Sequence, residues 1–242
     1  MSNSADPAAT VASSSTRAEF LRGLRDIFPI MVATVPFGMI FGALAAKEGL
    51  SLTENLLMSA LVYAGASQFV ALQFWTHPLP FWTILAAVLA VNLRHVLYSA
   101  AMGRKIGHWP AAARYGGFAL LVDPTFALAE LRGGARLSAA YYFGIAVPLY
   151  LNWVVCTALG AVFGNLIADP QAIGLDFVVT AYFIFLVVGF RKRPNALPVI
   201  LASAAGSVLA YATLGPPWHF AGGALAGMAI AAVLAKPREP AR

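Results

Sequence analysis

The stretch VYAGASQFVAL, at residues 62–72, places polar chemistry in the middle of an otherwise apolar run. Ser67 and Gln68 carry a hydroxyl and a primary amide, and they follow Gly65, whose backbone is the least restricted. Membrane transporters break helices at such points and direct the positive N-terminal end of a half-helix at an anionic substrate group. Close packing of membrane helices also uses small residues such as these. The stretch therefore predicts either a binding site formed by Gly65, Ser67, Gln68 and Phe69, or a helix-packing seam.

The string AVNLRHVLYSA, at residues 90–100, carries further polar side chains. Asn92 and His95 lie three positions apart and therefore share a face of a helix. Arg94 is predicted either to contact a ligand or to extend to the membrane surface. His95 is predicted either to be a structural histidine or to accept a proton, because imidazole titrates near neutral pH. Asn92 and Arg94 are thus candidate binding residues, and His95 is a candidate proton acceptor.

Asp123 is the carboxylate that lies well inside an apolar segment. An ionisable residue within a membrane segment is a functional candidate, because its burial is costly. Asp123 is therefore predicted to pair with a proton or an ammonium group, or alternatively to cap a helix at a kink set by Pro124. Trp153 lies beside Asn152 in another apolar run, and it either lines a binding pocket or packs at an interface.

The elements that must position these residues are membrane helices. The chain has 242 residues, of which 60% are hydrophobic and 11% charged, and its mean hydropathy is +0.75. A soluble domain would carry about a quarter charged residues. Apolar runs of roughly 17–25 residues are long enough to cross a bilayer. The sequence predicts an all-α polytopic membrane protein with about eight hydrophobic segments: 27–46, 56–75, 81–101, 115–131, 139–162, 175–190, 196–214 and 220–235.

The domain organisation follows from the same pattern. Residues 1–19 are predicted to form a disordered polar tail, residues 20–236 a single transmembrane domain, and residues 237–242 a short C-terminal tail. The formal net charge of +6 does not indicate nucleic-acid binding, because the basic residues lie between the segments, where cytoplasmic loops collect them. Cys156 is the single cysteine, so no disulfide framework is expected.

The basic residues also predict the topology. Those that precede the first segment favour a cytoplasmic N-terminus. If every segment crossed the membrane, the loop with Arg104 and Lys105 would lie outside, against the positive-inside tendency. The conflict disappears if the second and fourth segments are broken, at residues 65–68 and 123–124, and return to the side from which they enter. Both termini are then cytoplasmic.

No enzyme motif or metal-binding cluster is recognisable in the sequence. The histidines are scattered, and HExxH, GxSxG and phosphate-binding glycine motifs are absent. We therefore expect no catalysis, no metal and no cofactor. A channel stays an alternative to a transporter, because a polar break can also line a pore.

Strings along most of the chain carry a family resemblance: FPIMVATVPFGMIFGALAAKEGLS, MSALVYAGASQFVALQFW, VNLRHVLYSA, LVDPTFALAE and GLDFVVTAYF. From about Gly23 to about Tyr211 the sequence resembles the AzlC/YgaZ family, the large subunits of bacterial branched-chain amino-acid exporters. The most specific motifs are AGASQF at 64–69 and NLRH at 92–95. Family members commonly carry an acidic residue after the position of Asp123, where this chain has Pro124, so a carboxylate pair is not expected.

The resemblance implies secondary-active export of valine, leucine, isoleucine or methionine across the bacterial inner membrane. It also implies a partner, a small membrane subunit of the AzlD/YgaH type. For such a zwitterionic substrate we expect residues 65–68 and Arg94 to meet the carboxylate, Asp123 to meet the ammonium group, and Phe69 or Trp153 to line the side-chain pocket. The alternatives are a channel-like or other small-solute permease and, third, a membrane enzyme.

Overall fold

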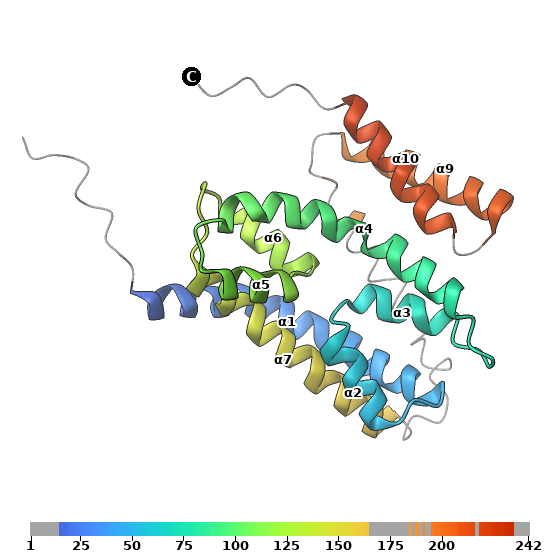
Figure 1. Ribbon diagram of the computed structural model, residues 1–242, viewed down its shortest axis with the longest axis horizontal. Coiled ribbons are helices and arrows are strands. Elements are labelled where there is room, and N and C mark those ends of the chain that lie inside the picture. Colours follow the sequence, from blue (N-terminus) through green and yellow to red (C-terminus); the bar gives the residue numbers. More distant parts are fainter. Residues whose placement is uncertain are drawn as a thin grey trace, which may run out of the picture. The chain divides into compact units, whose positions relative to one another are not determined.

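The computed structural model describes residues 15–164, 184, 187–188, 191, 195–215 and 218–234. Within these ranges the regular structure is helical and contains no strand (Figure 1), as the sequence predicts. The chain forms two compact units, described separately below: unit 1 is residues 1–33 and 98–152, and unit 2 is residues 34–97 and 153–242. The helices are α1 (Thr16–Lys47), α2 (Leu52–Leu61), α3 (Gly65–Gln73), α4 (Phe81–Ile106), α5 (Ala111–Ala119), α6 (Asp123–Leu131), α7 (Ala139–Phe163), α9 (Ala196–Leu214) and α10 (Trp218–Leu234).

Long apolar helices correspond to the predicted hydrophobic segments. Helices α1, α4, α7 and α9 are long and apolar enough to cross a membrane, and α10 is a shorter apolar helix. Most of the predicted segment 175–190 lies outside the described residues. Helix α1 begins at Thr16, so it starts within the predicted tail of residues 1–19. Residues 1–14 and the predicted C-terminal tail also lie outside the described part of the chain.

The second and fourth predicted segments are each divided into two short helices, which confirms that both are broken. Helix α2 has 10 residues, and α3, α5 and α6 have 9 residues each. At a rise of ~1.5 Å per residue these helices are about 14 Å long, roughly half the thickness of the bilayer core. None of the four is therefore long enough to cross a membrane alone.

The breaks lie just before the positions that the sequence analysis predicted. Residues 62–64 separate α2 from α3, and residues 120–122 separate α5 from α6. Gly65 and Asp123 are instead the first residues of α3 and α6. For α6 the reason is that Pro124 has a helical φ angle and needs no partner for an N–H group, which suits the first turn of a helix.

In unit 1, the chain enters and leaves the α5–α6 segment at the same place. Lys105, at the end of α4, forms a 3.0 Å ion pair with Glu130 near the end of α6. The Lys105 carbonyl also accepts a 3.1 Å hydrogen bond from the amide of Leu137, just before α7. The C-terminal end of α4 therefore lies beside the N-terminal end of α7. This is the geometry expected of a segment that turns back to its starting side.

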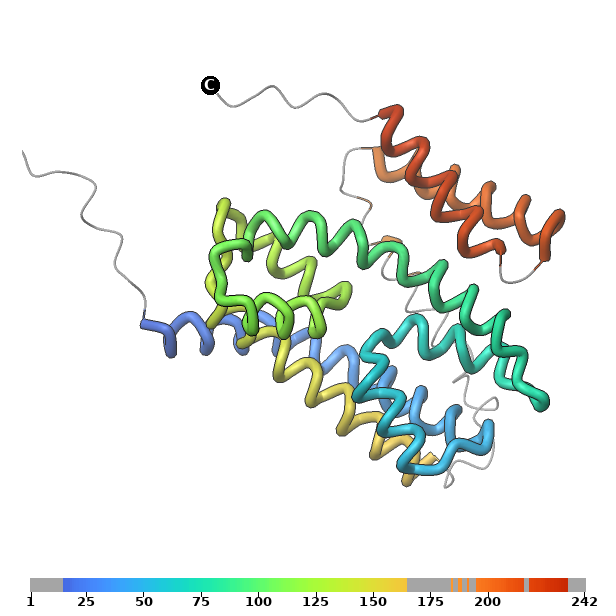
Figure 2. The backbone as a smooth tube through the Cα atoms, viewed as in Figure 1, coloured from blue at the N-terminus to red at the C-terminus, as the bar shows by residue number. Residues whose placement is uncertain are grey.

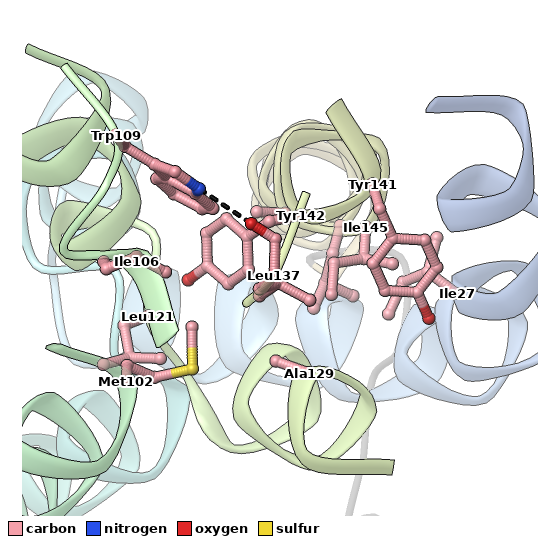
Figure 3. Close-up of a cluster of buried hydrophobic side chains, with 12 residues drawn as sticks. Ile27, Met102, Ile106, Trp109, Leu121, Ala129, Leu137, Tyr141, Tyr142 and Ile145 are labelled. Atoms are coloured by element: carbon pink, nitrogen blue, oxygen red, sulfur yellow. Dashed lines mark hydrogen bonds between the residues drawn. The ribbon is translucent and has the colours of Figure 1, made fainter. Parts of the chain in front are cut away.

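Buried aromatic side chains hold α5–α6 in place (Figure 3). The Trp109 indole donates a 2.8 Å hydrogen bond to the Leu137 carbonyl, and the Tyr142 hydroxyl of α7 donates at 2.8 Å to the Gly117 carbonyl of α5. Both bonds satisfy carbonyl groups in an apolar interior, where an unpaired group is costly. The other buried members of this cluster are Ile27, Met102, Ile106, Leu121, Ala129, Tyr141, Ile145, Ala146 and Leu149.

Charged side chains connect the helices at one end of unit 1 through hydrogen bonds. Glu19, on α1, is only 8% exposed and accepts hydrogen bonds from Arg132 at 2.8 Å and from Arg22 at 3.0 Å. The Arg132 guanidinium lies 4.4 Å from the ring centroid of Tyr141, whose hydroxyl donates to Asp26 at 2.8 Å. The N-terminal part of α1, the end of α6 and the start of α7 therefore meet at one end of this unit.

In unit 2, small residues let α1 and α7 run side by side in the same direction. A Cβ atom at Gly38 would lie 2.6 Å from the Cβ of Cys156, and one at Gly42 would lie 2.1 Å from the Thr157 carbonyl oxygen. Further along both helices, a Cβ atom at Gly164 would lie 2.4 Å from the Cβ of Ala43. Any larger residue at these glycines would push the helices apart.

The α2–α3 segment of unit 2 also doubles back, as the backbone trace in Figure 2 shows. Leu50, before α2, and Trp75, after α3, pack against the same hydrophobic cluster. A capping box starts α2, in which the Ser51 hydroxyl accepts from the Glu54 amide and the Glu54 carboxylate accepts from the Ser51 amide. The hydrogen bonds from the Ser51 side chain and backbone lower the pKa of the exposed Glu54 carboxyl.

Cysteine labelling tests the re-entrant arrangement in the membrane. Single cysteines at Gly103, Ala135 and Gln171, in a Cys156→Ser background, are treated in intact cells with an impermeant thiol reagent. Gly103 has open space around its Cβ position, and Ala135 is exposed. We expect positions 103 and 135 to be protected, because a fourth segment that turns back leaves both flanking loops in the cytoplasm. Position 171 should react, because it follows α7, which is long and apolar enough to carry the chain across the membrane. Labelling of position 103 from outside would contradict this topology.

Candidate functional site

A buried amide connects the two halves of the broken segment in unit 2. Gln68, in the first turn of α3, is 0% exposed. Its Nε2 donates to the Ser59 hydroxyl of α2 at 3.1 Å, and its Oε1 accepts from the indole N–H of Trp153 on α7 at 3.0 Å. The Ser59 hydroxyl lies 3.0 Å from the hydroxyl of Thr157, also on α7. Gln68 therefore links α2, α3 and α7 through both ends of its amide.

Aromatic side chains lie beside the N-terminal end of α3. A Cβ atom at Gly65 would lie 2.9 Å from Cη2 and 3.0 Å from Cζ2 of the Trp153 indole. The close approach at Gly65 is therefore to an aromatic side chain of α7. The ring of Phe41 lies 5.6 Å from that of Phe69, edge to face, and 6.2 Å from that of Trp153 in a stacked arrangement.

The first turn of α3 has the electrostatic character of an anion-binding end. Ala64 precedes the helix and supplies no side-chain cap. The N-terminal end of a helix carries a partial positive charge. In α3 the N–H groups of Ser67 and Gln68 donate to the Ala64 carbonyl at 2.8 and 3.0 Å, so the N–H groups of Gly65 and Ala66 form the exposed edge of this end. An anionic group is the natural partner for such an end.

The structure brings most of the predicted binding residues together in unit 2. The Ser67 hydroxyl, 1% exposed, donates to Oδ1 of Asn92 on α4 at 2.8 Å, which adds Asn92 to the residues around α3. Arg94 instead lines a groove of about 530 Å³, together with residues of α9 and α10 such as Ser203 and His219. His95 follows Arg94 on α4 and is half-buried.

Asp123 lies in unit 1 at the first position of α6. The Tyr98 hydroxyl of α4 donates to Asp123 Oδ1 at 2.8 Å, and the Tyr98 ring stacks on Phe126 with centroids 4.2 Å apart. The helix N-terminus favours the negative charge of Asp123. Thr125, which is fully buried, accepts from the Val122 amide at 2.9 Å and so satisfies the backbone of the break.

Ser59, Thr125 and Thr157 are buried polar residues that the sequence analysis missed. Each is 0% exposed, and each bonds to a broken segment as described above. The available signal was a polar side chain inside an apolar run. That signal does not identify a site by itself, because hydroxyls in membrane helices commonly bond to the carbonyls of their own helix, and nothing local distinguishes the two situations.

The groups assembled here favour binding rather than covalent chemistry. Around α3, in unit 2, they are an amide, hydroxyls, aromatic rings and a helix N-terminus. Among the described residues, no cluster of three or more His, Cys, Asp or Glu side chains could hold a metal ion. Such a set can recognise a polar ligand through hydrogen bonds and an apolar ligand through its rings.

Gln68→Leu tests how much the buried amide contributes to stability. Leucine removes the acceptor of the Trp153 N–H and the donor to Ser59, so we expect the free energy of unfolding to fall by about 1–3 kcal/mol, the cost of an unsatisfied buried group. The measurement is thermal unfolding in detergent. Gln73→Leu is the matched control, because Gln73 is an exposed residue at the end of the same helix. Equal unfolding temperatures for the two variants would contradict a stabilising role for Gln68.

Comparison with known proteins relates the chain to named relatives. The family model described as "AzlC protein" matches residues 29–167. Inner membrane protein YgaZ of Escherichia coli (strain K12) is 31% identical over 186 residues, which cover 74% of this chain and 76% of YgaZ. An uncharacterized membrane protein of Archaeoglobus fulgidus is 32% identical over 204 residues, 82% of this chain and 86% of the relative. The "Branched-chain amino acid transport protein AzlC" of Bacillus subtilis (strain 168) is 27% identical over 219 residues, 88% of this chain and 84% of that protein.

No solved structure matches the chain. The matched region, residues 29–167, includes both broken segments and the residues described around α3 and α6. The resemblance seen in the sequence is thereby confirmed, and the chain belongs to the AzlC family of membrane proteins.

Proposed function

We propose that the protein is a secondary-active exporter of branched-chain or similar neutral hydrophobic amino acids across the bacterial inner membrane, with both termini in the cytoplasm. The observation that carries the proposal is the uncapped, half-buried N-terminal end of α3. It lies beside the Trp153 indole, which belongs to the same hydrophobic cluster as Phe69. The name of the Bacillus subtilis relative, a branched-chain amino acid transport protein, supports this substrate class.

The chemistry of a neutral amino acid suggests a role for each group. In unit 2, the backbone N–H groups of Gly65 and Ala66 and the hydrogen-bonded Ser67–Asn92 pair suit the substrate carboxylate. Phe69 and Trp153 suit the apolar side chain, as rings do in most ligand pockets. In unit 1, Asp123 suits an ammonium group or a transported proton, because a carboxylate in a membrane protein's interior needs a positive partner.

Arg94 and His95, on α4, assist the proposed transport without forming the main substrate contacts. Arg94 lies on α4 two positions after Asn92, and its positive charge would attract a carboxylate that enters along its groove. His95 would accept and release a transported proton, because imidazole titrates near neutral pH.

The proposed partner is a small membrane subunit of the AzlD/YgaH type. In the most apolar windows of α4 and α9 only 6% of the residues are buried within the chain. These helices therefore have apolar surface that lipid or a second membrane protein can cover. A partner on this surface would be detected by co-purification of the two subunits from a mild detergent.

Substrate flux in vesicles tests the proposed function. The protein is reconstituted with its small subunit, and flux of labelled valine or leucine is measured with and without an ion gradient. Saturable, gradient-driven flux supports the exporter. Conduction that does not saturate would instead indicate a channel-like permease, and chemical conversion of the amino acid without transport would indicate an enzyme.

A further inference from the structure

Three hydrogen bonds link four buried side chains of unit 2, which we call the polar circuit: Trp153, Gln68, Ser59 and Thr157. Ser59, Gln68 and Thr157 are 0% exposed and Trp153 is 9% exposed. The circuit starts and ends on α7, because Trp153 and Thr157 lie four positions apart on one face of that helix. Between them it passes through α3 and α2.

The chemistry of the donors determines how Gln68 is oriented. An indole N–H can only donate, so it requires the Gln68 carbonyl oxygen as its partner. The amide nitrogen must then face Ser59, whose oxygen accepts from it. Ser59 can keep this acceptor available because its hydroxyl also has Thr157 as a partner. Removal of either hydroxyl leaves the amide nitrogen with a poorer partner, or with none.

The first turn of α3 depends on these contacts for its position. No side chain caps the helix at Ala64, so the helix start is not fixed by its own cap. Gly65 packs directly against the Trp153 indole, which Gln68 holds by its N–H. A change in the orientation of Gln68 therefore displaces the Trp153 indole, against which Gly65 packs.

We propose that Ser59 and Thr157 are positioning residues, which act through Gln68 and Trp153 to hold the N-terminal end of α3 in its binding geometry. The inference rests on the proposed function, since it assigns these two hydroxyls to the same substrate site. They do not contact the substrate. They determine where the backbone N–H groups of Gly65 and Ala66 lie.

The test compares Thr157→Val, which keeps the shape of the side chain but removes the hydroxyl, with Thr157→Ser, which keeps the hydroxyl. Thr213→Val is the matched control, because the Thr213 hydroxyl donates to the Leu209 carbonyl of its own helix, α9, and is not a member of the polar circuit. Each variant is reconstituted, and the half-saturation concentration and maximal rate of valine flux are measured per amount of protein. Amide hydrogen exchange over residues 65–73 is followed in the same preparations.

We expect Thr157→Val to raise the half-saturation concentration roughly tenfold, as loss of a hydrogen bond to a buried polar group would, with a smaller change in maximal rate. Exchange over residues 65–73 should increase, and Thr157→Ser and Thr213→Val should resemble the wild-type protein. Ser59→Ala should repeat the effects of Thr157→Val. Unchanged exchange in α3, or faster exchange throughout the protein with an unchanged half-saturation concentration, would overturn the inference. Failure of the wild-type protein to transport any amino acid would instead overturn the proposed function, and the exchange data would still show whether the circuit holds α3.

Discussion

Asp123→Asn is expected to reach the membrane at wild-type abundance and to lose most of its export. Asparagine keeps the size of the side chain and an oxygen that can accept from Tyr98, but it removes the negative charge. An ammonium group or a proton would then lose its counter-charge in the interior of the protein. A loss of at least ~1.4 kcal/mol corresponds to a roughly tenfold slower flux. The measurement is valine efflux at several external pH values, normalised to protein in the membrane.

Tyr98→Phe serves as the control for Asp123→Asn. It removes the hydrogen bond to Asp123 but keeps both the carboxylate charge and the ring that stacks on Phe126. We expect this variant to retain much more export than Asp123→Asn, because the loss of one hydrogen bond to the carboxylate costs less than the loss of the charge itself in a poorly solvated site. Wild-type efflux by Asp123→Asn at every pH would mean that Asp123 only begins the helix α6.

Gly65→Val is expected to abolish export. The first atom of the new side chain would already lie 2.9 Å from the Trp153 indole, and the branched methyl groups would add to the overlap. Trp153 is nearly buried and is held by Gln68, so it cannot move without breaking that hydrogen bond. Either α3 or the indole must therefore shift, and the proposed anion-binding end is displaced. Efflux and membrane abundance should be measured together.

Two further variants distinguish displacement of Trp153 from a general failure to fold. Gly103→Val is the control for a glycine replaced by valine in a helix, because no atom lies within 4 Å of the added Cβ at Gly103. If the overlap with the indole lowers the membrane abundance of Gly65→Val, the double variant Gly65→Val with Trp153→Phe should restore it, because phenylalanine lacks the outer indole atoms. The hydrogen bond to Gln68 stays absent in this variant, because phenylalanine has no N–H group in its ring. Normal export by Gly65→Val alone would show that the contact with Trp153 is dispensable and would remove the main support for a site at α3.

The broken segments show how far sequence reasoning reaches in this protein. Glycine and Asp-Pro in apolar runs, together with basic loops that conflict with a full set of crossings, predicted both breaks. Their positions were displaced by a few residues, because Gly65 and Pro124 begin the second half-helices instead of interrupting them. Proline is compatible with both situations, and only the preceding backbone decides between them.

The sequence by itself determined that this is a helical membrane protein of the AzlC family, which segments of the described part of the chain are helices, and which two of them are interrupted. These properties depend on local composition and on short motifs, so neighbouring residues contain the necessary information. The tertiary structure alone decided the partners of the buried polar groups. Gln68 bonds to Trp153 across 85 positions and Ser59 to Thr157 across 98, and Tyr98 reaches Asp123 across 25. A hydroxyl or an amide can bond to many kinds of partner, and the packing of distant helices selects among them by bringing particular groups within hydrogen-bonding distance.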